Sequence, residues 1–248
     1  MITQDDPPIW RTRSVEDFLK TVYLLQREGQ PVTTNQLARR LHIAPASATE
    51  MIKRLAGMVE ADDAGPPPIP EPLLEYQRYH GVRLSAAGEQ VALSVLRRRR
   101  LIELLLCRLF GYGWDEVDQE AERLEHAVSA QLEQRIAAVL GYPDFDPHGD
   151  PIPSETGMVL DETLVSLVAL QPGQTAVIRR ISDQEPETLR SLAHLGLVPE
   201  QVLTLRERND LNDTITLELG HRKVEIISTR VAQMIAVKVF PTDEITSI

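Results

Sequence analysis

A segment rich in proline and glycine divides this chain into two parts whose apolar residues follow different periods. It covers residues 141–153, and neither a helix nor a central strand is expected to run through it. Before it, apolar residues recur at the three- and four-residue spacing of amphipathic helices. After it, short runs alternate at the two-residue spacing of strands. The sequence therefore predicts an α+β, multi-domain chain.

The first 85 residues combine short helices with a hairpin. Ser14-Val-Glu-Asp17 has the form of a capping box that begins a first helix, and further helices are expected at residues 35–41 and 47–55. Residues 73–76 and 81–84 alternate apolar and polar side chains around a turn, which predicts a hairpin. Two short helices with a tight break, followed by a hairpin, are typical of a winged helix-turn-helix that binds DNA.

The side chains expected to face DNA lie on the third helix and the hairpin turn. They are Ala46, Ser47, Thr49, Glu50, Lys53, Arg78 and His80. The net charge of −11 opposes DNA binding, but residues 1–85 hold 10 basic and 11 acidic residues, so most of the acidity lies elsewhere. A proline-rich insertion at residues 61–72 is expected to form an extended, exposed loop.

Two further domains are expected after the winged helix. Residues 86–155 contain a long helix to Phe110 and two more from about Trp114 and Ser129, with apolar stripes that suit a small bundle or a dimer interface. Residues 156–248 contain five short strands and one helix, which indicates a small β-barrel. The predicted strands are 175–181, 202–207, 214–219, 223–227 and 236–240, and the predicted helix is 187–195.

One motif has the composition of a metal site. It consists of Glu122, Glu125 and His126. Positions i, i+3 and i+4 lie on one face of a helix, so these three side chains are expected to converge as a divalent metal site requires. Two carboxylates and one imidazole, without a thiolate, suit Mn²⁺ or Fe²⁺ better than structural zinc. Taken alone, the same residues are more often a solvated face of an amphipathic helix.

Cysteine usage and hydropathy restrict the cellular context. Cys107 is the single cysteine and lies in an apolar run, so a disulfide framework is excluded. No apolar stretch reaches the roughly 18 to 20 residues of a membrane helix. We therefore expect a cytoplasmic protein without a membrane partner.

Five stretches of this sequence together resemble a known family. Residues 14–23, 45–55, 79–84, 120–126 and 147–153 are similar to the DtxR/MntR family of metal-dependent transcriptional repressors. Residues 160–240 resemble the SH3-like, FeoA-type domain at the C-terminus of its longer members, most clearly at Leu195-Gly-Leu-Val-Pro199. The resemblance implies a non-enzymatic homodimer that binds a palindromic DNA operator when Mn²⁺ or Fe²⁺ is bound, and that represses metal-uptake genes.

Carried over residue by residue, the resemblance places the metal ligands at Asp17, Glu122, Glu125 and His126. A carboxylate at Glu122 favours Mn²⁺, because iron-type members have cysteine at that position. Asp17 has an alternative role as the last residue of a capping box on its own helix. Weaker matches imply ancillary metal ligands at Glu103, Asp118 and Glu185.

Two cations depart from the family's pattern. Lys20 and Arg99 stand where manganese-type members have an acid and a histidine, and Arg99 lies one helical turn before Glu103. Our sequence-based hypothesis is one principal metal per protomer, with an Arg99–Glu103 pair in place of a second ion. The alternative is a metal-independent winged-helix regulator in which Lys20 and Arg99 supply the charge.

A metal-dependent regulator has two rival functions. The first is a di-metal carboxylate enzyme, which requires a second Glu-x-x-His set that this sequence lacks. The second is an interaction protein whose main module is the C-terminal domain, which would bind a transporter or the proline-rich residues 64–72.

Overall fold

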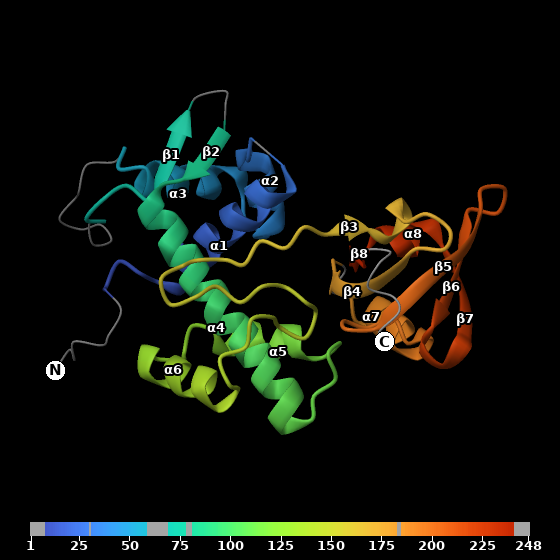
Figure 1. The fold of residues 1–248 in the computed structure, drawn as a ribbon. Helices are drawn as coiled ribbons and strands as arrows, with labels where there is room; N and C mark the ends of the chain where they lie inside the picture. Colours follow the sequence, from blue (N-terminus) through green and yellow to red (C-terminus); the bar gives the residue numbers. More distant parts are fainter. Residues whose placement is uncertain (1–7, 30, 59–68, 78–80, 183–184, 241–248) are drawn as a thin grey trace. The chain divides into compact units, whose positions relative to one another are not determined.

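The computed structural model describes residues 8–29, 31–58, 69–77, 81–182 and 185–240. The chain folds as two compact units. The first contains Met1–Arg99, Leu124–Arg135 and Pro153–Met158, and the second contains Arg100–Arg123, Ile136–Ile152 and Val159–Ile248. The long helix α4 (Ala86–Phe110), drawn in green in Figure 1, contributes residues to both.

Helix α1 (Arg13–Glu28) begins two residues earlier than the capping box predicted. Thr12 has an extended backbone, and its hydroxyl accepts a hydrogen bond from the backbone N–H of Val15. The prediction that Ser14 and Asp17 form the cap is therefore wrong, because both residues lie inside the helix. Asp17 is thus available for contacts outside α1.

Helices α2 (Thr34–Arg40) and α3 (Pro45–Leu55) form the predicted helix pair. Thr33 and Gln36 make a reciprocal capping box at the start of α2. The break contains His42 in a left-handed conformation, with φ of 53°, and Pro45 occupies the first turn of α3. The break therefore ends one helix and sets the direction of the next.

The hairpin consists of β1 (Leu74–Gln77) and β2 (Gly81–Leu84), which pair antiparallel as predicted. The backbone N–H of Val82 donates to the carbonyl of Val32, which attaches the hairpin to the helices. Gly81 has φ of 88°, and a Cβ there would lie 2.6 Å from the Val32 carbonyl oxygen, so glycine is required. Arg78, His80 and most of the proline-rich insertion lie outside the described residues.

Helices α5 (Val117–Leu124) and α6 (Ala130–Val139) follow α4. The prediction that Glu122, Glu125 and His126 share one helical face is wrong, because α5 ends at Leu124 and the next residues form a turn. Glu122 is exposed, whereas Glu125 is fully buried.

The C-terminal domain is an antiparallel six-stranded sheet in the order β3-β8-β4-β5-β6-β7. Five strands match the predicted ones to within two residues, and the two-residue β3 and the short α8 were not predicted. The strands are β3 (Val165–Ser166), β4 (Thr175–Ile181), β5 (Val202–Asn209), β6 (Thr214–Leu219), β7 (Lys223–Ser228) and β8 (Ile235–Val239). The helices are α7 (Pro186–Leu195), α8 (Thr229–Gln233) and the 3₁₀ turns η1 (Leu167–Ala169) and η2 (Gly220–Arg222).

Register shifts bend this sheet around its own core. They occur between Ile178 and Arg180 in β4 and between Leu205 and Glu207 in β5. Alternating residues of β4, β5, β6 and β8 pack with apolar residues of α7 in one buried cluster. The predicted α+β, multi-domain fold is confirmed.

Candidate metal centre

Asp17, Glu125 and His126 form a compact group of potential metal ligands. Asp17 comes from α1, and the other two come from the turn after α5. The Nε2 atom of His126 lies 3.0 Å from Asp17 Oδ1 and 3.2 Å from Glu125 Oε1. One potential ligand atom from each residue lies within 4.8 Å of the others. The three side chains thus converge on one small volume, although not through the helical geometry that the spacing suggested.

Glu16 orients the imidazole of this group. Glu16 Oε2 lies 2.6 Å from His126 Nδ1, which turns Nε2 toward Asp17 and Glu125. Two arginines hold Glu16 in turn, with Arg11 Nε at 2.7 Å and Arg98 Nη2 at 2.8 Å from Oε1. The sequence analysis did not predict a role for Glu16. Its position next to the predicted ligand Asp17 was the single indication in the sequence. A carboxylate behind a ligand histidine fixes its orientation and raises its basicity.

The charges around the imidazole shift its protonation. Burial opposes the imidazolium, but hydrogen bonds with Asp17, Glu125 and Glu16 outweigh it and raise the pKa of His126 to about 10. Burial likewise opposes the Glu16 carboxylate, yet His126, Arg98 and Arg11 lower its pKa to about 2. His126 is therefore protonated at neutral pH in the metal-free protein, and a metal must displace that proton.

Lys20 also belongs to this group. Its ammonium hydrogen-bonds to Glu125 Oε1 and lies 3.4 Å from Asp17 Oδ1. The side chain is 8% exposed, and that of Glu125 is 0% exposed. Arg99 approaches the other carboxylate oxygen of Glu125, with Nη1 at 3.8 Å from Oε2. The two cations that depart from the family pattern therefore both face the same buried carboxylate.

The four arginines at residues 97–100 are not a solvated basic run. Arg97 Nε lies 2.8 Å from Glu133, and Arg98 reaches Glu16. All four side chains are no more than 15% exposed. The side chains of this run therefore lie mostly within the protein, whereas the predicted Arg99–Glu103 pair stays a prediction.

A second group of potential ligands contains Glu103, Asp146 and His148. All three are buried, and one potential ligand atom from each lies within 4.8 Å of the others. His148 Nε2 lies 2.8 Å from the carbonyl oxygen of Trp114, which accepts only, so Nε2 carries the proton. His148 Nδ1 is buried without a hydrogen-bond partner. Its lone pair is therefore available to a cation.

The backbone around His148 holds this group in place. Asp146 Oδ1 accepts hydrogen bonds from the backbone N–H groups of His148 and Asp150. Burial and the neighbouring Asp150 raise the pKa of Asp146 to about 6. The His148 carbonyl accepts from the N–H of Ile181 in β4. The sequence pattern predicted that residues 141–153 form a loop. The signal for a metal site within this loop was a histidine with an aspartate two residues away on each side.

Comparison with known proteins identifies the family. Residues 11–60 match the model of the N-terminal DNA-binding domain of the iron-dependent repressor. Residues 85–154 match the model of its metal-binding and dimerisation domain. A FeoA domain matches residues 165–239. A solved manganese-dependent transcriptional repressor in complex with manganese is 35% identical, with a TM-score of 0.80, over 91% of this chain and 100% of its own.

Curated relatives agree with this match. The diphtheria toxin repressor of Corynebacterium jeikeium (strain K411) is 30% identical over 182 residues, covering 70% of this chain and 68% of that protein. The iron-dependent repressor IdeR of Mycobacterium leprae (strain TN) is 28% identical over 86% of this chain and 92% of its own length. The chain belongs to the DtxR/IdeR family. This DtxR/IdeR-family member is a metal-dependent, DNA-binding transcriptional repressor and not an enzyme.

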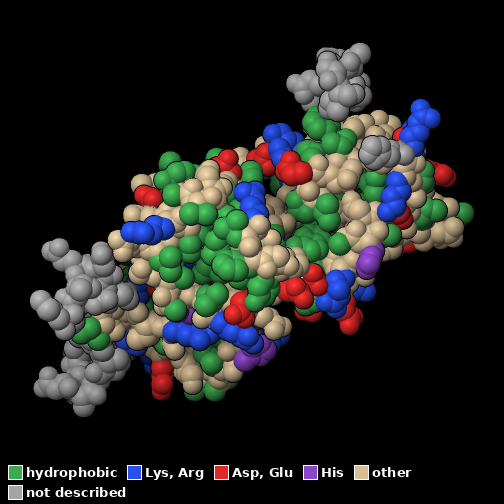
Figure 2. Space-filling model, turned by 90° about the horizontal axis from the view of Figure 1, so that it is seen from below, with side chains coloured by type: hydrophobic (Ala, Val, Ile, Leu, Met, Phe, Trp, Pro, Cys, Tyr) green, Lys and Arg blue, Asp and Glu red, His purple; other side chains and the backbone are tan. Residues whose placement is uncertain are grey.

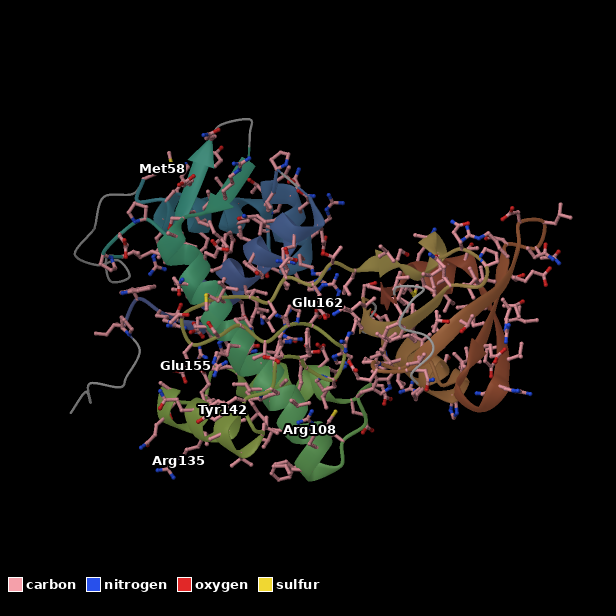
Figure 3. The ribbon with its side chains drawn as sticks, viewed as in Figure 1. Met58, Arg108, Arg135, Tyr142, Glu155 and Glu162 are labelled. Atoms are coloured by element: carbon pink, nitrogen blue, oxygen red, sulfur yellow. The ribbon has the colours of Figure 1, made fainter. Side chains whose placement is uncertain are left out.

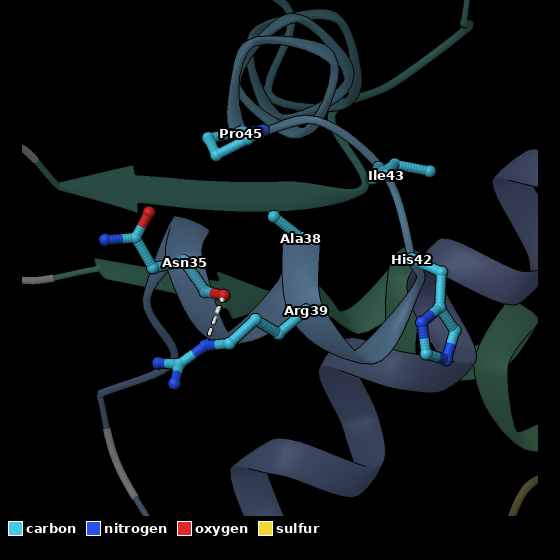
Figure 4. Close-up of a pocket in the computed structure, with 6 residues that line it drawn as sticks. All are labelled: Asn35, Ala38, Arg39, His42, Ile43 and Pro45. Carbon is cyan, nitrogen blue, oxygen red and sulfur yellow. Dashed lines mark hydrogen bonds between the residues drawn. The ribbon is translucent and has the colours of Figure 1, made fainter.

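The DNA-binding domain of this DtxR/IdeR-family repressor presents the predicted face of α3. Exposed residues of this helix include Ala46, Ser47, Thr49, Glu50 and Lys53, whereas Ala48, Ile52 and Leu55 are buried. Beside the start of α3 lies a surface hollow of about 550 Å³, shown in Figure 4. The Arg39 side chain on its wall donates to the Asn35 carbonyl. The predicted face of α3 is therefore accessible.

Three predicted ligands lie outside both groups in the described part of the chain. Glu122 is exposed on α5, Asp118 is partly buried on the same helix, and Glu185 is exposed at the start of α7. Their roles as ligands stay predictions. Among the described residues, no helix combines the length and apolar composition that a membrane crossing requires.

Proposed function

We propose that this DtxR/IdeR-family repressor responds to Mn²⁺ through Asp17, Glu125 and His126, with Fe²⁺ as the second candidate. The observation that carries this proposal is the convergence of two carboxylates and one oriented imidazole at a buried position. Such a donor set fits a cation that accepts both oxygen and nitrogen ligands. The solved chain described above is named for its dependence on manganese.

The same three residues couple the metal to DNA binding. Asp17 belongs to α1 of the winged helix, whereas Glu125 and His126 belong to the segment matched by the metal-binding and dimerisation domain. These residues would hold a divalent cation, which would supply two positive charges to balance the carboxylates of Asp17 and Glu125. This balance of charge would favour the arrangement in which α1 is held to the turn after α5. A ligand that favours one arrangement of two elements shifts the population toward it.

Glu103, Asp146 and His148 are proposed as a second metal site. The supporting observations are the buried, unpartnered Nδ1 atom of His148 and the two buried carboxylates whose ligand atoms group with this histidine. This proposal replaces the sequence-based hypothesis of one metal per protomer. Because the loop of His148 is hydrogen-bonded to β4, occupancy of this site also stabilises the attachment of the loop to the C-terminal domain.

The dimerisation and DNA-binding domains imply a homodimer on a DNA operator, and we propose a palindromic operator of metal-uptake genes. Apolar residues exposed around the C-terminal ends of α4 and α6 supply a candidate dimer surface. They are Leu109, Phe110, Tyr112, Val139 and Tyr142. Figure 2 shows hydrophobic side chains gathered on the face seen from below, and Figure 3 labels Tyr142.

Fluorescence anisotropy with a pool of palindromic DNA duplexes tests this function. The full chain is titrated at fixed salt in chelator and in Mn²⁺, Fe²⁺ or Zn²⁺. We expect tightening with Mn²⁺ at the lowest free metal concentration. Binding that is equally tight in chelator, or tightening by Zn²⁺ alone, would contradict the proposal.

A further inference from the structure

Lys20 occupies the place in the first ligand group where a cation binds two of the ligands at once. Its ammonium contacts Glu125 Oε1 and lies 3.4 Å from Asp17 Oδ1. These are the same two oxygens that lie 3.2 Å and 3.0 Å from His126 Nε2. Lys20 and Asp17 are one turn apart on α1, so the helix itself brings the ammonium to the ligands.

The contact between Lys20 and Glu125 is important because both side chains are buried. The Glu125 side chain is completely buried, and a buried carboxylate without a compensating charge is strongly unfavourable. In the metal-free protein the Lys20 ammonium supplies part of that charge, together with the protonated His126 and Arg99. It also ties α1 to the turn after α5, which is the connection proposed for the metal.

An ammonium and a divalent cation compete for these oxygens. A metal held by Asp17 and Glu125 would lie close to the Lys20 ammonium, and two positive charges at that separation repel each other. Lys20 would therefore have to give up its contacts with these oxygens, and the free energy of those contacts would reduce the free energy gained on metal binding.

Arg99 faces the other oxygen of the same carboxylate. Its Nη1 atom lies 3.8 Å from Glu125 Oε2, whereas Lys20 hydrogen-bonds to Oε1. The contacts of Lys20 are with the two oxygens that also lie beside His126 Nε2, so we expect them to overlap with those of a metal.

We propose that Lys20 is a built-in competitor that sets the metal affinity of the Asp17–Glu125–His126 site. The inference rests on the proposed function, and it makes Lys20 the determinant of the metal concentration at which the repressor responds. The lysine holds the metal-free site together and raises the threshold for its occupation.

Lys20→Met tests this competition in the full chain. Mn²⁺ affinity is measured by isothermal titration calorimetry in a His148→Gln background, so that the proposed second site is removed. We expect Lys20→Met to bind Mn²⁺ about tenfold more tightly or better, which corresponds to roughly 1.4 kcal/mol. Lys20→Arg, which keeps a cation, should bind within a few-fold of the parent.

Lys238→Met is the matched control, because it removes one positive charge from an exposed lysine of the C-terminal domain. Its Mn²⁺ affinity should equal that of the parent. Unchanged or weaker affinity in a folded Lys20→Met protein, checked by circular dichroism, would overturn the proposal. Lys20→Gln provides a second variant if the methionine prevents folding.

A second readout separates this inference from the proposed function. In chelator, Lys20→Met should have a lower thermal midpoint than Lys238→Met, because Glu125 loses one of its buried cationic partners. An equal midpoint overturns the role of Lys20 whatever the metal response. If Glu125→Ala leaves Mn²⁺ binding unchanged, the proposed metal site fails, while a lowered midpoint in Lys20→Met still supports the buried ion pair.

Discussion

The Nδ1 atom of His126 lies 2.6 Å from a carboxylate oxygen of Glu16, and this contact directs the opposite ring nitrogen toward Asp17 and Glu125. Glu16 is in turn held by Arg11 and Arg98. The geometry of the proposed metal site therefore depends on a residue that would not itself coordinate the metal.

Glu16→Gln should weaken Mn²⁺ binding while keeping every proposed ligand. Loss of a carboxylate behind a metal-ligating histidine typically reduces affinity by about 10- to 100-fold. Calorimetric titration measures the change. Glu28→Gln, at the exposed end of the same helix, is the matched control and should behave as wild type. Equal effects of the two substitutions would rule out an orienting role for Glu16.

The stability of the metal-free protein should fall as pH rises above 6.5. The pKa of His126 is raised from 6.5 to about 10 through its hydrogen bonds to the three carboxylates, despite burial. Its contribution is therefore complete below pH 6.5 and is lost as pH rises through about 10. Thermal midpoints in chelator, compared between wild type and His126→Gln, measure this slope. Parallel pH profiles for the two proteins would contradict it.

His148→Gln should reduce the number of tightly bound metal ions from two to one per protomer. The substitution removes the unpaired Nδ1 lone pair of the second group. Native mass spectrometry of the Mn²⁺-loaded protein gives the count. His194→Gln, at an exposed histidine of α7, is the control. A wild-type protein that retains a single ion would exclude the second site.

Gly149→Ala should destabilise the second unit strongly. A Cβ at Gly149 would lie 1.7 Å from the Arg179 carbonyl oxygen, with φ of 87°. Gly173 has the same φ, but a Cβ there has nothing within 4 Å. Gly173→Ala therefore measures the backbone cost alone, about 1 kcal/mol, and Gly149→Ala should cost about 2 kcal/mol more in urea unfolding. Equal losses would show that the loop yields easily.

Much of the fold could be predicted because local patterns specify it. The two-residue alternation in residues 73–84 and 175–239 gave the hairpin and five of the six sheet strands, and the break at Pro45 gave the helix pair. The cap of α1 was wrong because two hydroxyl residues, Thr12 and Ser14, compete for that role within three positions. Their backbone angles decide between them, and the sequence pattern does not contain those angles.

The site was predictable only in part because it depends on long-range contacts. The motif drew attention to Glu125 and His126, but a helix end at Leu124 changes which side chains converge. Glu16 and Lys20 reach His126 and Glu125 across more than one hundred residues of sequence. No spacing rule within a single helix detects such partners.

Mn²⁺-dependent DNA binding by wild type and Glu125→Ala, measured by fluorescence anisotropy with palindromic duplexes at fixed salt, tests the central claim most directly. The wild-type protein should bind more tightly in Mn²⁺ than in chelator, and Glu125→Ala should bind equally weakly in both. Tightening by Mn²⁺ that persists in Glu125→Ala would contradict the assignment of the metal to Asp17, Glu125 and His126.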